Sequence, residues 1–484
     1  MALHAREDTT LQTPTGRARF EAEHRRIWNE AVGPRGFGAY YHQRLVEIYR
    51  FLVSPNKRVL EIGCASGDLL AAVAPSRGVG VDFAEKMLEV ARRHHPALHL
   101  VESSIEDAKI DETFDFIILS DVVNDLWDIR AVLERCHLWC HPRTRVIINL
   151  YSRLWQPVLG AARRLSLARR VPPQSWVTTE DMKNFLRLAE FDVLRSWQEV
   201  LWPLSTPFVA ALCNKFLVKL WPFRTAALTN FVVARPAPRR SGDLERASVS
   251  VVVPARNEAG NVRTILERVP ELGNGTEIAF VEGGSEDGTY QVIEREMKMF
   301  PHRKIQLLKQ SGRGKNDAVR LGFSKASGDI LMILDADVTV PPEDLRFFYH
   351  ALVSGTGEFV NGVRLVYPME NQAMPFFNLL GNKFFSLGFS ALLGQDIKDT
   401  LCGTKVLWRE DYRRIEENRA YFGEFDPFGD FDLLFGAAKL NLRIVDMPVR
   451  YRERTYGSTN IHRWKHGWLL LKMLVFAARR IKFV

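Results

Sequence analysis

The chain alternates between short apolar runs and longer amphipathic segments. Apolar runs, such as those that open RVLEIGCASGDLLAAV (58–73) and FDFIILSDVVNDLWD (114–128) and the β-branched run VSVVVP (249–254), are separated by stretches in which apolar residues recur at helical spacing. Alternation of this kind predicts mostly parallel sheets covered by helices. We therefore expect an α/β fold with two doubly wound domains, in which ligands bind at the carboxyl ends of the strands.

The clearest interruption of this pattern is the stretch ARPAPRRSGDLERAS at 234–248. It is rich in Pro, Arg and small polar residues, and a new β-branched run starts directly after it. A chain of 484 residues is also too long for one ordinary core. We expect a helical extension over 1–39, a first domain over 40–235, a linker over 236–247, a second domain over 248–460 and a basic amphipathic helix over 461–484.

Composition narrows the class of protein. A hydrophobic content of 46% with 25% charged residues is typical of a globular chain, and five cysteines give no disulfide framework, which favours a reducing compartment. The first residues lack the apolar core of a signal peptide, and no apolar run has the length of a spanning helix. We expect a cytoplasmic protein, soluble or peripheral to a membrane. The formal net charge of +9 favours an anionic partner.

A glycine turn follows the first strand of the chain. Residues 58–73, RVLEIGCASGDLLAAV, predict a strand, a turn and a helix, and Gly63 and Gly67 would let backbone amides approach a ligand. The next strand ends at Asp82, about 20 residues beyond the turn, where a carboxylate can accept two hydrogen bonds from a ribose diol. The turn with its spaced acid predicts a nucleotide-type ligand.

These motifs resemble the class I methyltransferases that use S-adenosylmethionine. LEIGCASG is similar to the family pattern E-x-G-x-G-x-G, and FDFIILSDVVNDLWD resembles the fourth strand and its active-site loop. A dehydrogenase would also have a glycine turn, but the acid before the turn fits the methyltransferase pattern better. The resemblance implies a Rossmann-like domain that binds S-adenosylmethionine through Glu61, Gly63, Ala65, Gly67 and Asp82. Ala65 departs from the middle glycine, and the methyl acceptor is not readable.

Two further segments of the first domain allow more than one interpretation. CHLWCH at 136–141 has metal-ligand residue types, but we expect it on a helix that runs into the fifth strand. The segment 202–224 is apolar and contains two Trp residues, with Lys215 and Lys219 one helical turn apart. It predicts either a helix that caps the methyl-acceptor pocket or an interfacial helix on a membrane.

The second domain places polar and acidic residues after successive strands. An apolar run at 329–334 ends on Asp335 and Asp337, and buried carboxylates need a partner such as a divalent cation. A nucleoside diphosphate would be the reason to hold that cation. The other candidate contacts in these loops are Pro254, Asn257, Glu258, Glu282 and Lys315.

In this order the motifs resemble glycosyltransferase family 2, with its nucleotide-diphospho-sugar transferase (GT-A) fold. The resemblance implies that Asp335 faces the ribose or the metal and that Asp337 holds Mg²⁺ or Mn²⁺. It also implies that a nucleotide-sugar donor contacts Pro254, Asn257, Glu258, Glu282 and Lys315. The family commonly has two acids before GS, whereas here the second position is Gly283, so the base of the nucleotide is not implied.

The last third of this domain resembles the polyprenyl-phosphate glycosyltransferases of the dolichol-phosphate type. IKDTLCGTKVLWRE at 397–410 and the stretch after 428 carry this resemblance. A lipid monophosphate acceptor needs cationic positioning, and Arg452 and Arg454 would share one face of a strand. Asp430, with Asp399 and Asp432, is an acidic candidate near the acceptor side.

The C-terminal segment carries Lys465, Lys472 and Arg479 at seven-residue spacing. Apolar residues and Trp468 fill much of the rest of the helix, which suits an anionic membrane surface. A core helix packed on the domain is the alternative. NIHRW at 460–464 differs by one residue from the Q-x-x-R-W signature of processive polysaccharide synthases, but the chain lacks the spanning helices of an export channel.

We therefore expect a bifunctional enzyme. Its C-terminal domain would transfer a sugar from a nucleotide sugar to a polyprenyl phosphate at the inner face of the membrane, and its N-terminal domain would transfer a methyl group from S-adenosylmethionine. The alternatives are a catalytically silent methyltransferase-like scaffold, or a glycosyltransferase acting on a saccharide acceptor. A nucleic-acid methyltransferase ranks last, because no basic stripe interleaved with aromatic residues lies near the methyltransferase motifs.

Overall fold

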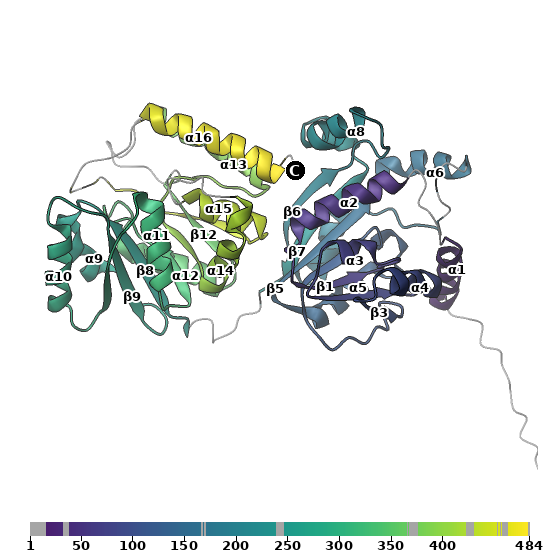
Figure 1. Cartoon of the computed structure of the whole chain (residues 1–484), viewed down its shortest axis with the longest axis horizontal. Helices are drawn as coiled ribbons and strands as arrows, with labels where there is room; N and C mark the ends of the chain where they lie inside the picture. Colours follow the sequence, from purple (N-terminus) through teal and green to yellow (C-terminus); the bar gives the residue numbers. More distant parts are fainter. Residues whose placement is uncertain are drawn as a thin grey trace, which may run out of the picture. The chain divides into compact units, whose positions relative to one another are not determined.

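The computed structural model describes residues 16–31, 38–165, 168, 171–238, 246–364, 366, 376–422, 430–452, 454, 456 and 463–482. The chain divides into two compact units, Met1–Pro236 and Ala237–Val484. Each unit is built on a seven-stranded sheet with helices around it (Figure 1). The two-domain α/β prediction is confirmed by these sheets, whereas the predicted residue boundaries stay predictions.

The first sheet has the strand order β3-β2-β1-β4-β5-β7-β6. Its strands are β1 (Arg58–Ile62), β2 (Arg77–Asp82), β3 (His99–Glu102), β4 (Phe114–Ser120), β5 (Cys140–Tyr151), β6 (Phe191–Glu199) and β7 (Thr229–Pro236). The helices of this unit are α1 (Gly16–Glu30), α2 (Ala39–Leu52), α3 (Asp68–Ala72), α4 (Glu85–His94), α5 (Ile129–Cys136), α6 (Gln156–Arg164), α7 (Thr179–Leu188) and α8 (Val209–Ala211). Only β7 runs antiparallel to its neighbours β5 and β6.

Apolar residues on both faces of the strands explain why helices cover the sheet on two sides. Leu60 and Ile117 face one cluster of buried residues, to which α5 and α7 contribute Leu133 and Leu186. The adjacent strand residues face a second cluster, to which α2 contributes Leu45. Because successive side chains of a strand point to opposite faces, a continuous apolar run requires cover on both sides.

The second sheet has the strand order β10-β9-β8-β11-β13-β12-β14. Its strands are β8 (Val249–Ala255), β9 (Thr276–Glu282), β10 (Lys304–Lys309), β11 (Ile330–Ile333), β12 (Phe359–Val363), β13 (Lys405–Trp408) and β14 (Ile444–Pro448). The helices are α9 (Val262–Arg268), α10 (Thr289–Met299), α11 (Gly314–Lys325), α12 (Leu345–Val353), α13 (Phe376–Leu393), α14 (Arg409–Glu417), α15 (Asp430–Lys439) and α16 (Arg463–Ala477). Here β13 runs antiparallel to β11 and β12.

Both sheets bring the candidate residues to one edge. In the second sheet β8, β9 and β11 are parallel, so Ala255, Glu282 and Ile333 end at the same edge. In the first sheet β1, β2 and β4 likewise end together, at the edge that carries the glycine turn and Asp82. The predicted ligand residues of each unit therefore gather at the carboxyl ends of its parallel strands.

Helix α16 packs along α13 in the second unit (Figure 1). A Cβ atom on Gly388 of α13 would lie 2.8 Å from the Leu474 side chain, so the glycine permits a close approach of the two helices. Met473 is buried, whereas Trp468 and Val475 are exposed. The helix thus has a packed face and an apolar exposed face, and its membrane role stays a prediction. Within the described residues, no helix has both the length and the apolarity needed to span a bilayer.

The stretch after β14 differs from the prediction. Arg452 and Arg454 were expected on one face of a strand, but β14 ends at Pro448 and the described residues from 449 to 456 are not in a strand. Arg452 is exposed, while Arg454 is partly buried against two carboxylates. An irregular backbone lets alternate residues point to different surroundings, which a strand does not.

Candidate active sites

The glycine turn of the first unit adopts left-handed backbone conformations. Gly63 and Gly67 both have φ of 72°, and Ala65 has φ of 45°. A Cβ atom on Gly63 would lie 2.5 Å from Val122, which follows β4, so the turn and the loop after β4 are in close contact. The glycines therefore allow the backbone of the turn to lie close to the loop after β4. Ala65 has a strained backbone conformation that favours glycine.

Asp82 stabilises this turn through both carboxylate oxygens. One oxygen accepts a hydrogen bond from the backbone N–H of Ala65 at 2.8 Å, and the other accepts from Ala84 at 2.8 Å. Burial raises the pKa of the carboxyl, although these backbone bonds act in the opposite direction. Glu61, at the end of β1, is also buried. A carboxylate has about four lone-pair sites, so Asp82 keeps acceptor capacity for a diol.

A cluster of polar side chains that the sequence analysis did not single out lies in the loop after β4. The carboxylate of Asp121 accepts hydrogen bonds from the Tyr41 hydroxyl at 2.9 Å, the Asn149 amide at 2.6 Å and the Tyr151 hydroxyl at 3.3 Å. Burial raises the pKa of Asp121 to about 7, although the two tyrosine hydroxyls lower it. Asp121 directly precedes Val122, so the cluster adjoins the glycine turn. Its only sequence signal was its place in the segment that resembles the active-site loop.

The CHLWCH segment has the predicted placement at a helix end before β5. Cys136 is buried at the end of α5, and His137 lies with its Nε2 atom 2.6 Å from the carbonyl oxygen of Ala189. In the part of the chain that the structure describes, no three His, Cys, Asp or Glu side chains form a group that could hold a metal.

The two aspartates of the second unit lie just beyond β11 and each contacts a cationic side chain. Lys315, in the first turn of α11, places its Nζ 2.6 Å from Asp335. Burial alone would raise the pKa of the Asp335 carboxyl, but Lys315, Lys405 and Arg364 outweigh it and hold the pKa below its ordinary value. Asp335 is therefore ionised at neutral pH, as a metal or hydroxyl ligand must be.

Gly403 makes this ion pair possible. A Cβ atom at this position would overlap both the Asp335 carboxylate and the Lys315 ammonium group. The glycine lies in the segment between Asp399 and β13, far from Asp335 in the sequence. Its role could not be found from the sequence, because nothing local marks it.

We expect Gly403→Ala to lower sugar transfer by about 100-fold, because a displacement of about 1 Å in a catalytic group has an effect of that size. The methyl group would push Asp335 and Lys315 from their present positions. Steady-state rates and thermal unfolding should be measured together. A matched control is Gly160→Ala in α6 of the first unit, where nothing lies within 4 Å of the added atom. Unchanged sugar transfer in Gly403→Ala would show that the Asp335–Lys315 pair is dispensable.

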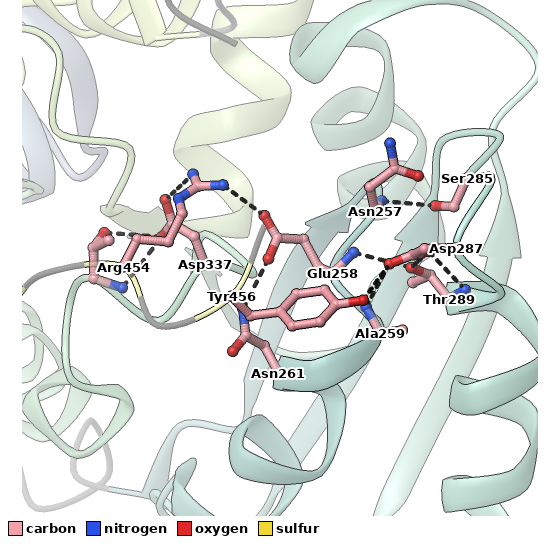
Figure 2. Close-up of polar contacts among 11 residues, drawn as sticks. Asn257, Glu258, Ala259, Asn261, Ser285, Asp287, Thr289, Asp337, Arg454 and Tyr456 are labelled. Carbon is pink, nitrogen blue, oxygen red and sulfur yellow. Dashed lines mark hydrogen bonds and ion pairs between the residues drawn. The ribbon is translucent and has the colours of Figure 1, made fainter. Parts of the chain in front are cut away.

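Asp337 is bound to Arg454, which joins it to the loop after β8 (Figure 2). The Arg454 guanidinium lies 2.6 Å from Asp337 and 3.1 Å from Glu258. The second Asp337 oxygen accepts a hydrogen bond from the Thr339 hydroxyl at 2.8 Å. Burial raises the pKa of Glu258 to about 7, while Arg454 and Asn261 lower it.

The loop after β8 is fixed by its neighbour after β9 (Figure 2). Asn257 has φ of 57°, and its side chain accepts a hydrogen bond from the backbone of Glu286 at 2.9 Å. Asp287 accepts from the backbone of Ala259 and from the Tyr456 hydroxyl, each at 3.1 Å. Tyr456 packs so closely on Gly260 that a Cβ there would lie 2.5 Å from its ring. Arg454 and Tyr456 thus tie the segment after β14 to the candidate donor site.

The remaining candidates fall into two groups. Pro254 and Glu282 lie at the carboxyl ends of β8 and β9, as predicted, and Glu282 is buried and accepts a hydrogen bond from the backbone of Ser285.

Asp399 and Asp432 have structural contacts. Asp399 forms a buried two-point ion pair with Arg364 at 2.7 and 2.9 Å, and Asp432 binds Arg320 and Arg419. Asp430 begins α15, and its side chain lies outside the described residues.

The donor set at Asp335 and Asp337 fits a hard divalent cation in part. Two carboxylates supply oxygen ligands, and Mg²⁺ commonly binds one or two carboxylates with substrate phosphates completing its coordination. Both carboxylates already contact a cationic side chain, at 2.6 Å in each case. Positive charge is therefore favoured at both positions, and a cation bound there would compete with Lys315 and Arg454.

Comparison with known proteins finds a family-model match in each unit. The family model "Glycosyl transferase family 2" matches residues 250–415, and "Methyltransferase domain" matches residues 59–143. Dolichol-phosphate mannosyltransferase of Pyrococcus furiosus is 31% identical over 248 residues, which cover 49% of this chain and 67% of the relative. Undecaprenyl-phosphate 4-deoxy-4-formamido-L-arabinose transferase of Aeromonas hydrophila is 31% identical over 232 residues, covering 47% and 65%.

A solved structure is also similar. Glucosyl-3-phosphoglycerate synthase of Mycobacterium tuberculosis, crystallised with Mn²⁺, uridine diphosphate and glucosyl-3-phosphoglycerate, matches with a TM-score of 0.36 at 19% identity. The match covers 51% of this chain and 85% of that structure. The chain spans 67% and 65% of the two curated relatives above, so each of them has a further third with no counterpart in the match.

Proposed function

The C-terminal half of this chain belongs to glycosyltransferase family 2, and from that premise we propose that it transfers a sugar from a nucleotide-diphospho-sugar to a polyprenyl-phosphate lipid. The chain is a transferase with a second, methyltransferase, domain. The observation that carries the proposal is the alternation of acid and cation at the end of β11, where Asp335 pairs with Lys315 and Asp337 with Arg454. In such a site the acids can hold a divalent cation and the cationic side chains can bind phosphate oxygens.

The residues have separate roles in this mechanism. A divalent cation at Asp335 and Asp337 would offset the charge that grows on the diphosphate as the glycosidic bond breaks. Lys315 stands beside Asp335, where an ammonium group can also approach a phosphate oxygen. Asn257 and Glu258 belong to the loop that Asp287 and Tyr456 hold in place, so this loop would form a fixed wall for the nucleotide.

The acceptor is already an anion, so the enzyme needs to position its phosphate more than to deprotonate it. Arg454 lies between Asp337 and Glu258, and Arg452 is exposed two residues earlier. Arginine suits a phosphate because its planar fork can bind two oxygens at once. Two curated relatives are named for dolichol phosphate and undecaprenyl phosphate, which supports a lipid phosphate as the acceptor here.

Apolar side chains on α13 and α16 support a peripheral position at the membrane. Among the described side chains of these two helices, the exposed large apolar residues are Phe384, Leu387, Trp468, Leu471 and Val475. Lys383 and Lys472 are exposed beside them, and basic residues favour the anionic inner leaflet. We propose that this surface brings the donor site to the lipid acceptor.

The first unit would bind S-adenosylmethionine at the glycine turn, with Asp82 accepting from the ribose. Glu61, Gly63, Ala65 and Gly67 would line this site, and both glycines hold the left-handed backbone of the turn. The match to a methyltransferase model over residues 59–143 supports this part of the proposal.

We expect Arg452→Ala to raise the Michaelis constant for polyprenyl phosphate by about 10- to 100-fold at saturating donor. One charge-assisted contact contributes about 1.5–3 kcal/mol. Arg454→Ala should raise it similarly and also lower kcat, because this residue binds Asp337. Lysine at either position should rescue only part of the loss.

Initial rates at varied lipid phosphate and at varied nucleotide sugar separate these effects. The matched control is Arg263→Ala, which removes an exposed arginine that pairs with Glu267 on α9. Equal acceptor dependence in Arg452→Ala, Arg454→Ala and wild type would show that neither arginine contacts the acceptor phosphate.

Mass spectrometry of lipid-linked sugars in cells with and without the protein tests the whole proposal. It should show a polyprenyl-phosphate sugar that depends on the protein, and a methyl group on that species if the first unit acts on the same product. An unchanged set of lipid-linked sugars, together with a new soluble saccharide, would instead support a saccharide acceptor.

A further inference from the structure

The connection between β6 and β7 exposes a large apolar surface on the first unit. This connection, residues 200–226, folds into α8 and the short helical turns Leu212–Phe216, Leu217–Lys219 and Phe223–Ala226. Phe208 is 91% exposed and Trp221 is 75% exposed. The full set of exposed large apolar residues in the segment is Trp202, Leu204, Phe208, Val209, Leu212, Phe216, Leu220, Trp221 and Phe223.

The exposed side chains are not the result of a loose segment. Asn214 is buried, accepts from the backbone N–H of Trp202 at 2.8 Å and donates to its carbonyl at 2.6 Å. Lys219 forms a buried ion pair with Glu199, and the Trp155 indole donates to the carbonyl of Ala226 at 2.9 Å. The inner side of the segment is therefore fixed by polar contacts, and its apolar residues are directed outward by a defined backbone.

The charge of the segment is uniformly positive. Between Val200 and Thr229 the sequence contains no Asp or Glu, while Lys215 and Arg224 are exposed. A solvated surface with no function would normally contain acids among its basic residues. Exposed Trp and Phe beside Lys and Arg, without acids, have the chemistry of a lipid headgroup interface.

The segment lies at the same edge of the sheet as the glycine turn. β7 is antiparallel to both β5 and β6, so β6 runs parallel to β5 and ends beside Tyr151 and Thr229. Figure 1 shows α8 beyond this end of the sheet. The Thr229 hydroxyl donates to the Tyr41 oxygen at 3.2 Å, which connects the end of the segment to the Asp121 cluster. A partner of this surface would approach the candidate cofactor edge.

We propose that residues 200–226 form a docking surface for a bilayer with anionic headgroups, independent of the surface on α13 and α16. The aromatic and aliphatic side chains enter the headgroup region, and Lys215 and Arg224 lie against the lipid phosphates. The exposure of Phe208 and Trp221 favours this interpretation over the alternative, a cap over the methyl-acceptor pocket.

Vesicle co-sedimentation of the full chain tests the proposal, with phosphatidylcholine vesicles that contain or lack phosphatidylglycerol. Phe208→Ser with Trp221→Ser should lower the partition coefficient by about 100-fold, since each aromatic side chain that leaves water contributes about tenfold. Lys215→Gln with Arg224→Gln should lower it by about 25-fold on anionic vesicles, and by less than about twofold on neutral ones. The matched control is Leu138→Ser with Leu188→Ser, which removes exposed apolar side chains elsewhere on the first unit.

Hydrogen exchange supplies a second measurement that does not depend on a variant. Anionic vesicles should slow the exchange of backbone amides in residues 200–226 of the wild-type chain. Unchanged exchange there, or unchanged partition of both double variants, would overturn the proposal. A wild-type dimer without lipid that becomes a monomer in Phe208→Ser with Trp221→Ser, with vesicle binding retained, would assign the surface to self-association and also overturn it.

Discussion

Replacing Asp337 with alanine is expected to lower divalent-dependent sugar transfer by about 1000-fold or more. A bound cation supplies several kcal/mol of charge stabilisation in the transition state, and each 1.4 kcal/mol is about a tenfold change in rate. Asp337 is one of two carboxylates in reach of the donor phosphates in this proposal, and it fixes Arg454 at 2.6 Å. The measurement is the rate of sugar transfer as a function of Mg²⁺ or Mn²⁺ concentration.

The fold should survive this substitution. Asp337 lies in the turn after β11 and its side chain is outside the apolar core, and Arg454 keeps Glu258 as a partner when Asp337 is removed. Asp329→Ala is the matched control, because it removes a carboxylate that binds Ser248 at the opposite end of the same strand. Full activity of Asp337→Ala, or of wild type in excess chelator, would exclude the metal role.

The second large effect concerns the cofactor. Asp82→Ala should weaken S-adenosylmethionine binding by about 100-fold while sugar transfer stays intact. Two charge-assisted bonds to a ribose diol would be lost, each contributing about 1.5 kcal/mol, and the Ala65 amide would lose the acceptor that fixes the glycine turn. Isothermal titration calorimetry with S-adenosylmethionine measures this directly.

Asp115→Ala is the control for a general effect on the sheet. Asp115 accepts a hydrogen bond from the backbone of Arg58 at 2.9 Å, at the amino end of β1 and so at the opposite edge from Asp82. It should lower stability without changing cofactor affinity. If the wild-type chain itself does not bind S-adenosylmethionine, the first unit is a scaffold and the methyl-transfer proposal fails.

Site residues that lie next to their own strand in the sequence could be predicted from the sequence. The turn at Gly63 and Gly67, the acid Asp82 and the pair Asp335 and Asp337 are each encoded next to the strand that positions them, so the pattern of apolar runs was enough to place them at a sheet edge. Lys315 was also named as a candidate donor contact, and it lies in the first turn of the helix before β11.

Contacts between distant segments were not predictable in the same way. Gly403 matters because of atoms that belong to Asp335 and Lys315, and the Asp121 cluster joins residues from α2, β5 and the loop after β4. Arg454 is predicted to face a lipid phosphate, and in the structure it forms ion pairs with Asp337 and Glu258. Such contacts between distant segments cannot be identified from a single sequence, and they become visible only in the folded structure.

The position of the antiparallel strands has a consequence for how the chain is made. In both sheets a strand that comes later in the sequence lies between two earlier ones: β7 between β5 and β6, and β13 between β11 and β12. Until residues 229–236 or 405–408 leave the ribosome, the two strands that flank the missing strand lack it as a neighbour. Unpaired edges are sites of aggregation. Fragments that end shortly before Thr229 or Lys405 should therefore aggregate, while synthesis past Pro236 lets the first unit fold before the second is complete.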